Sequence, residues 1–262
     1  MTSNYDEEDT STAFFIMYNP LRLLTLYLAL LCHALPSHAQ DLLIAFEPSH
    51  SEPYVIMNGN ELANSLTKSL GDAIAQAAGM TAVYQITSRA RIEKDTELGI
   101  VHMNCLTTPQ WFKNPQSVLW SVPLLNEEER YLLPHEAADI VTQIDLDGRS
   151  IGLIRNYRYP SLEEGLATGR FTRDDSMNVQ QAYRKLKRGR IDAMLAKDIQ
   201  INYLMKNDPT ARQFKLATRV ESRNTLLCAI SRNLPYSATR LEQAFQKLKV
   251  TGQLERIANE YR

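Results

Sequence analysis

Residues 107–125 read TTPQWFKNPQSVLWSVPLL, and this stretch is the most informative part of the chain for the fold. It follows an apolar run at residues 100–105 and precedes a second apolar run, Tyr131-Leu132-Leu133. Short apolar runs of this kind predict buried strands. The stretch therefore joins two predicted strands, and it places two tryptophan side chains, Trp111 and Trp120, in the connection.

Outside this stretch, predicted strands alternate with predicted helices. The apolar runs that predict strands occupy residues 42–46, 81–87, 100–105, 150–154, 191–195, 214–220 and 226–230. Apolar side chains at helical spacing occupy residues 62–77, 179–186, 199–205, 241–248 and 254–261. This alternation predicts an α/β fold with mainly parallel sheets flanked by helices.

The composition suits a globular protein of one or two domains. The chain has 262 residues, of which 44% are hydrophobic, and this is enough for a packed core. Its formal net charge is −1, so the charge balance offers no electrostatic basis for binding nucleic acid or an anionic membrane surface.

The N-terminal segment has the features of a secretory leader. Residues 23–31, LLTLYLALL, form an apolar run that is shorter than the roughly 20 residues needed to span a bilayer. Arg22 precedes this run, and small residues at Ser37 and Ala39 predict cleavage after Ala39. The acidic residues before Met17 do not suit a leader, so we predict that the natural start is Met17 and that the protein is exported to the periplasm.

Export bears on the cysteines. Cys105 and Cys228 would lie in an oxidising compartment, where a disulfide can form. Two buried apolar thiols are the alternative, and the sequence leaves this open.

Five further motifs fall in a familiar order around the opening stretch. Together with Thr108-Pro109-Gln110-Trp111 and Trp120-Ser121-Val122-Pro123, the chain resembles periplasmic solute-binding proteins of the polar amino-acid type (family 3) of ABC transporters. The matching segments are residues 45–54, 99–104, 146–153, 187–193 and 251–257.

The resemblance implies a two-lobed, type II periplasmic-binding-protein fold with a ligand cleft between the lobes. Its expected domains are residues 1–39 as leader, 40–133 with 225–262 as lobe 1, and 134–224 as lobe 2. It also implies amino-acid transport by a monomer that delivers a small molecule to an ABC permease or a membrane sensor. No nucleic acid and no cofactor are implied.

The resemblance also indicates where the usual amino-acid clamp is altered. In the family, an arginine binds the ligand carboxylate, and the matching position of this chain holds Trp111. An acid binds the ligand ammonium, and the matching position by direct counting holds Lys197, with Asp198 one residue later. Trp111 is either a wall of the cleft or a packing residue, and Asp198 is either a ligand contact or a helix cap. The predicted ligand-binding set is Glu47, Ser51, Tyr54, Asn104, Thr107, Trp111, Arg155, Tyr157, Arg158 and Asp198.

The sequence favours binding over catalysis. The five histidines lack metal-ligand spacing, and neither a nucleophile motif nor a phosphate-binding glycine loop is present. The predicted function is therefore capture of a small polar or anionic solute. The alternatives are a periplasmic enzyme of the dehydratase kind, with Glu47 as its acid, and a ligand sensor.

Overall fold

The computed structural model describes residues 39–48, 50–155 and 157–262, which form one compact unit. The predicted leader and the start at Met17 lie outside the described residues, apart from Ala39. Nine strands of these residues form one sheet, in the order β4-β1-β5-β11-β7-β10-β8-β9, with β6 paired to β11. A separate pair, β2 (Met57–Asn58) and β3 (Glu61–Leu62), forms a small ribbon.

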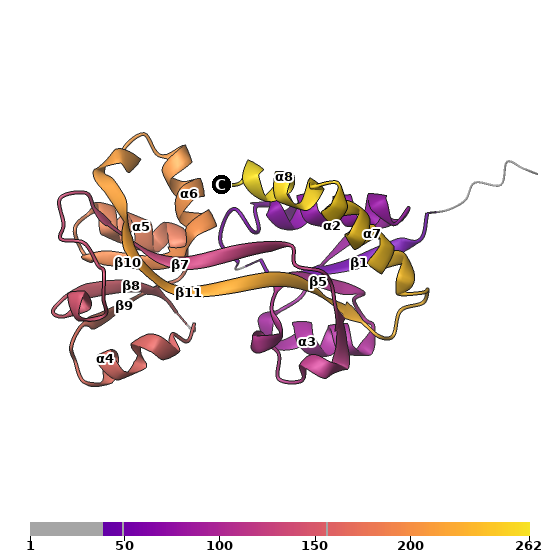
Figure 1. Ribbon diagram of the computed structural model, residues 1–262, viewed down its shortest axis with the longest axis horizontal. Coiled ribbons are helices and arrows are strands. Elements are labelled where there is room, and N and C mark those ends of the chain that lie inside the picture. The colour runs from indigo at the N-terminus through magenta and orange to yellow at the C-terminus, as the bar shows by residue number, and fades with distance from the viewer. Residues whose placement is uncertain (1–38, 49, 156) are drawn as a thin grey trace, which may run out of the picture. The chain divides into compact units, whose positions relative to one another are not determined.

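Lobe 1 is built on one end of this sheet. Its strands are β1 (Asp41–Phe46), β4 (Thr81–Ile86), β5 (Met103–Thr107) and β6 (Val118–Trp120), and its helices are α2 (Leu66–Ala77), α3 (Arg89–Leu98), α7 (Thr239–Val250) and α8 (Gln253–Glu260). β1 pairs in parallel with β4 and β5. Because side chains alternate along a strand, Ile44 packs toward α2 while Ala45 packs against Ile92 of α3, so helices cover both faces (Figure 1).

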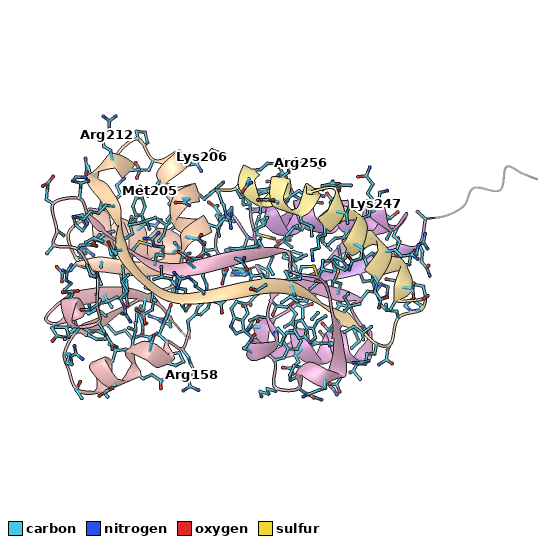
Figure 2. All side chains as sticks on the ribbon, in the orientation of Figure 1. Arg158, Met205, Lys206, Arg212, Lys247 and Arg256 are labelled. Carbon is cyan, nitrogen blue, oxygen red and sulfur yellow. A yellow bond between two sulfur atoms is a disulfide. The ribbon has the colours of Figure 1, made fainter. Side chains whose placement is uncertain are left out.

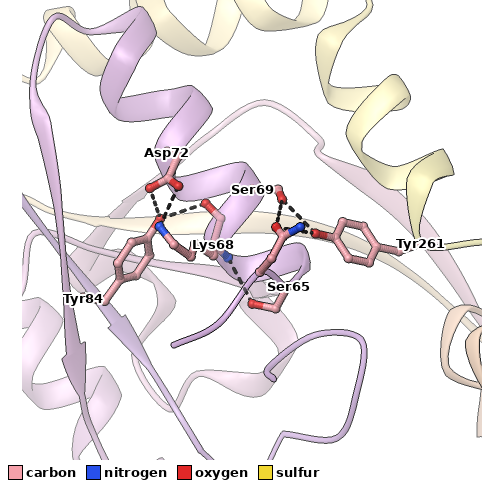
Figure 3. Close-up of polar contacts among 7 residues, drawn as sticks. Ser65, Lys68, Ser69, Asp72, Tyr84 and Tyr261 are labelled. Atoms are coloured by element: carbon pink, nitrogen blue, oxygen red, sulfur yellow. Dashed lines mark hydrogen bonds and ion pairs between the residues drawn. The ribbon is translucent and has the colours of Figure 1, made fainter. Parts of the chain in front are cut away.

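Polar contacts hold α2 in place on lobe 1 (Figure 3). The Ser65 hydroxyl caps the helix by accepting from the Lys68 backbone N–H at 3.4 Å, and the Tyr84 hydroxyl of β4 donates to the Lys68 carbonyl at 2.8 Å. The Tyr261 hydroxyl lies 2.8 Å from the Ser69 hydroxyl, so the end of the chain is fastened to the same helix. Lobe 1 therefore combines residues from both ends of the described chain.

Lobe 2 repeats the arrangement at the other end of the sheet. β8 (Ser150–Ile154) pairs in parallel with β9 (Thr172–Ser176) and β10 (Ala193–Lys197). Its helices are α4 (Glu163–Ala167), α5 (Val179–Lys187) and α6 (Asp198–Asn207). Leu153 and Phe171 are buried in one cluster and Met194 in another, so the sheet of lobe 2 has a core on each face.

Two long strands run through both lobes. β7 (Leu125–Pro134) and β11 (Phe214–Ser231) pair antiparallel, and Figure 1 shows them side by side between the two groups of elements. At its lobe 1 end β11 pairs antiparallel with β5, where Cys105 and Cys228 are partners and form a disulfide. The question that the sequence left open is therefore answered by a bridge.

The structure confirms the predicted α/β, two-lobed fold, with parallel strands inside each lobe and antiparallel pairing along β7 and β11. The predicted lobe boundaries, 133/134 and 224/225, fall within these two strands and stay a prediction. The pattern did not predict α3 or β9. α3 buries only three side chains, those of Ile92, Asp95 and Thr96, so its apolar signal is weak.

Candidate ligand-binding site

A charged cluster lies where β10 ends beside the two long strands. Lys197 is the last residue of β10, and its ammonium Nζ lies 2.8 Å from Glu127 Oε1 and 3.0 Å from Glu129 Oε1. The three side chains are 12%, 2% and 16% exposed. Burial alone lowers the pKa of Lys197, but the two carboxylates outweigh it and raise that pKa, so the lysine stays charged.

The loop that follows β1 packs onto this cluster through His50 and Tyr54. The Tyr54 hydroxyl donates to Glu127 Oε2 at 2.5 Å, and the Tyr54 ring is stacked on His50 with centroids 4.6 Å apart. Burial, followed by the positive charges of Lys197 and Arg89, lowers the pKa of His50 to about 4. His50 is therefore neutral at pH 7 and is a flat ring beside two cations.

Trp111 lies between these two cations. Its ring centroid is 5.5 Å from Lys197 Nζ and 5.6 Å from Arg89 Cζ, distances typical of cation–π contacts. Trp111 ends the short 3-10 helix Pro109–Trp111, is partly buried, and also packs against the lobe 1 core. Both interpretations of Trp111 therefore have support: it packs, and it presents a ring to the residues between the lobes.

The lobe 2 loop after β8 approaches the same place. Tyr157 is 46% exposed. Partial desolvation and then the carboxylate of Glu47 raise its pKa, while the cations Arg89 and Lys197 oppose this rise. Tyr157 of lobe 2 is therefore within electrostatic range of Glu47 and Arg89 of lobe 1. We call His50, Tyr54, Arg89, Trp111, Tyr157 and Lys197 the inter-lobe site.

The two arginines of that loop are placed differently from Tyr157. The Arg158 side chain is 82% exposed, lies at the surface (Figure 2), and forms an ion pair with Glu163 at 2.9 Å. Arg155 is exposed, and its backbone N–H donates to the Ser176 carbonyl at 2.9 Å. The structure therefore brings Tyr157 to the inter-lobe site, whereas Arg158 is engaged on the outside of lobe 2.

A direct hydrogen bond joins the lobes beside the site. The Ser51 hydroxyl in lobe 1 accepts from the backbone N–H of Val179, the first residue of α5 in lobe 2, at 3.2 Å. The N–H groups of a first helical turn have no partner within the helix. Ser51 therefore satisfies one of these donors across the lobe boundary.

The remaining predicted residues lie at strand ends. The Asn104 amide donates to the Ala45 carbonyl at 3.3 Å and so braces β5 against β1. Thr107 is 2% exposed, and its hydroxyl has no hydrogen-bond partner among the described residues. Glu47 is partly buried just after β1, and Asp198 begins α6, where its Oδ1 accepts from the Glu128 N–H at 3.1 Å.

Three residues of the inter-lobe site were absent from the predicted ligand-binding set. From the sequence, Lys197 marks only the position of an expected acid. His50 lies with Glu47, Ser51 and Tyr54 in a loop where an aromatic or polar wall is expected, but it is not in the predicted set. Arg89 is the first residue of α3, the helix that the apolar pattern missed. Two parallel neighbours of one strand need a crossover between them, and residues 88–98 are the segment available between β4 and β5. The need for a crossover between β4 and β5 could therefore have indicated a helix in this segment, with Arg89 at its start.

A hollow lies within lobe 1 and shares no residue with the inter-lobe site. It has a volume of about 540 Å³ and lies between the segment after β6 and α7. Its lining includes Trp120, Val122, Glu242 and Phe245. Trp120 is held by a bond from its indole N–H to the Pro115 carbonyl and by edge contact with Phe112, which matches a packing role.

Within the described part of the chain, no group of three or more metal-binding side chains is found. No helix in that part is both long and apolar enough to cross a membrane.

Comparisons with known proteins agree with this architecture. No family model and no curated protein matches the sequence. Among solved structures, an ancestral arginine-binding protein bound to arginine has a TM-score of 0.66 at 16% identity, covering 86% of this chain and 99% of its own. A histidine kinase sensor domain with similarity to periplasmic binding proteins has a TM-score of 0.66 at 16% identity, covering 86% and 96%.

The substrate-binding protein of an amino-acid ABC transporter has a TM-score of 0.60 at 15% identity, covering 84% of this chain and 98% of its own. At this level of identity the likeness shows the fold alone. The chain therefore has the two-lobed fold of type II periplasmic binding proteins, as its sequence motifs predicted.

Proposed function

We propose that this protein is a periplasmic solute-binding protein that captures a small polar or anionic solute between its lobes. The observation that carries the proposal is Trp111, whose ring centroid lies 5.6 Å from Arg89 Cζ and 5.5 Å from Lys197 Nζ. The charge of Arg89 attracts a ligand with negative charge, and the ring beside it offers a surface to a flat or apolar body.

The solute would then be passed to a membrane partner. Lobes joined by two strands can close around a ligand by hinge motion, and a partner can distinguish the closed form from the open one. An ABC permease is the partner we propose first, and a membrane sensor second. The fold neighbours include the substrate-binding protein of an amino-acid ABC transporter and a histidine kinase sensor domain.

The test is a thermal-shift screen of the purified protein against amino acids, dicarboxylates and aromatic acids, followed by isothermal titration calorimetry of every hit. A ligand that binds only the folded state raises the melting temperature in a saturable way. Mass spectrometry of the ligand after incubation separates binding from catalysis. An unchanged ligand supports capture, while turnover would replace the proposal with the enzyme alternative.

Trp111→Ala gives the first mutational prediction. It should weaken binding of the hit at least tenfold and lower the melting temperature by only a few degrees, because the ring is partly exposed. Trp120→Ala is the matched control, since it removes the same side chain outside the inter-lobe site. A large loss of stability with unchanged affinity for Trp111→Ala would show that this residue serves only packing.

A further inference from the structure

Among the residues that the structure describes, Arg89 is the cation of the inter-lobe site for which no ion pair with a carboxylate is found. Its guanidinium lies over the Trp111 ring. A cation–π contact uses the charge of a guanidinium but none of its five N–H donors. Arg89 therefore keeps its hydrogen-bonding capacity for another partner.

The strand ends around Arg89 add unused hydroxyl groups. Thr87 directly follows β4, two residues before Arg89, and is 4% exposed, and Thr107 is the last residue of β5 and is 2% exposed. Neither hydroxyl has a hydrogen-bond partner among the described residues. Buried polar atoms are nearly always paired in native proteins, so these two hydroxyls keep unused hydrogen-bonding capacity at the strand ends beside α3.

The first turn of α3 also favours negative charge. The Ser88 side chain does not cap it, and it contains no acidic residue. A helix N-terminus carries a partial positive charge that adds to the charge of Arg89.

Lys197, in contrast, is already compensated. Glu127 Oε1 and Oε2 accept from Lys197 and Tyr54, and Glu129 Oε1 and Oε2 accept from Lys197 and Ser222. All four carboxylate oxygens thus have a donor from within the chain. The cluster therefore offers a ligand ammonium only oxygens that already accept a hydrogen bond, and Lys197 offers no uncompensated charge to a ligand anion.

We propose that Arg89 binds the anionic group of the ligand at the start of α3, beside Trp111, and that the ligand is a small carboxylic acid without an α-ammonium group. This inference deepens the proposed function and rests on it. A guanidinium can hold a carboxylate with two parallel hydrogen bonds, and the indole provides a flat wall for the carbon chain or ring. The ammonium of an α-amino acid would lose its hydration without gaining an unoccupied acceptor at the cluster of Lys197, Glu127 and Glu129.

The experiment compares acids that differ only in the amino group. The pairs are succinate and L-aspartate, glutarate and L-glutamate, 3-phenylpropionate and L-phenylalanine, and 4-methylpentanoate and L-leucine, each titrated by calorimetry. We expect the acid that lacks the amino group to bind at least tenfold more tightly in at least one pair.

Arg89→Gln should weaken that acid at least tenfold, and Arg89→Lys should be intermediate because it keeps the charge but loses the paired donors. Arg91→Gln is the matched control on the same helix, since the Arg91 side chain is 70% exposed and pairs with Asp95 at 3.4 Å. It should change affinity less than twofold, and circular dichroism should show all three variants folded.

Two outcomes overturn the inference while leaving capture of a solute intact. One is tighter binding of the amino acid in every pair that binds, and the other is an equal effect of Arg89→Gln and Arg91→Gln. Absence of binding by all eight probes and by every compound of the wider screen would instead overturn the proposed function together with the inference.

Discussion

At the scale of single residues, the most consequential side chain is Lys197. It places an ammonium where Glu127 and Glu129 approach each other from one strand, and all three groups are largely buried. Two carboxylates this close repel each other in a medium of low dielectric constant, and the lysine offsets the repulsion. The cluster is therefore a structural brace of the hinge strand β7 as well as a border of the inter-lobe site.

We expect Lys197→Met to lower the free energy of unfolding by about 3–5 kcal/mol, because removal of one partner leaves buried charge uncompensated. The triple variant Lys197→Met/Glu127→Gln/Glu129→Gln should recover at least half of that loss. Urea unfolding followed by circular dichroism measures both, with exposed Lys113→Met as a control near zero. A triple variant less stable than the single one would contradict this account.

At the scale of elements, the disulfide between β5 and β11 fastens the long strand β11 to lobe 1. Cys105 and Cys228 are partners in the antiparallel ladder and lie in the lobe 1 core, 123 residues apart in the sequence. A cross-link across so long a loop removes much of the conformational entropy of the unfolded chain. The bridge also ties the strand that ends at Thr107 to a strand that enters lobe 2.

Reduction of the disulfide should lower the free energy of unfolding by about 3–5 kcal/mol. The measurement is urea unfolding with and without dithiothreitol. The double variant Cys105→Ala/Cys228→Ala should be insensitive to the reductant and similar in stability to the reduced protein. If the unmodified protein unfolded at the same urea concentration under both conditions, the bridge would contribute nothing to stability.

At the scale of the whole described unit, the proposed ligand capture depends on contacts between the two lobes. The hydrogen bond from the Val179 N–H to Ser51 is such a contact. It holds the start of α5 against the loop that follows β1, and it lies outside the core of either lobe. If the lobes close around a ligand as proposed, this bond favours the same arrangement as the ligand.

Ser51→Ala should weaken ligand binding about two- to tenfold, the equivalent of one hydrogen bond of about 0.5–1.5 kcal/mol. The free energy of unfolding without ligand should change by less than about 0.5 kcal/mol. Calorimetry with the hit from the screen measures the first, and urea unfolding the second. The Ser69 hydroxyl contacts Tyr261 within lobe 1, so the control variant Ser69→Ala should leave the affinity unchanged. An equal effect of the two variants on affinity would argue against an inter-lobe role for Ser51.

The sequence by itself determined the class of the fold. Apolar runs at residues 42–46 and 150–154 and helical spacing at residues 179–186 are local patterns, and each became the expected strand or helix. The motifs around Trp111 then predicted two lobes, which the solved structures of similar fold confirm. Local pattern suffices here because a buried face must repeat with the period of its element.

Only the tertiary structure decided which side chains meet. Lys197 is far in sequence from Glu127 and Tyr54, and β10 reaches them by pairing with β7. Arg89 was hidden because α3 buries few apolar residues, so its helix has almost no pattern to detect. Contacts between such distant residues depend on strand pairing across the whole sheet, and hydrophobic periodicity within one segment carries no information about that pairing.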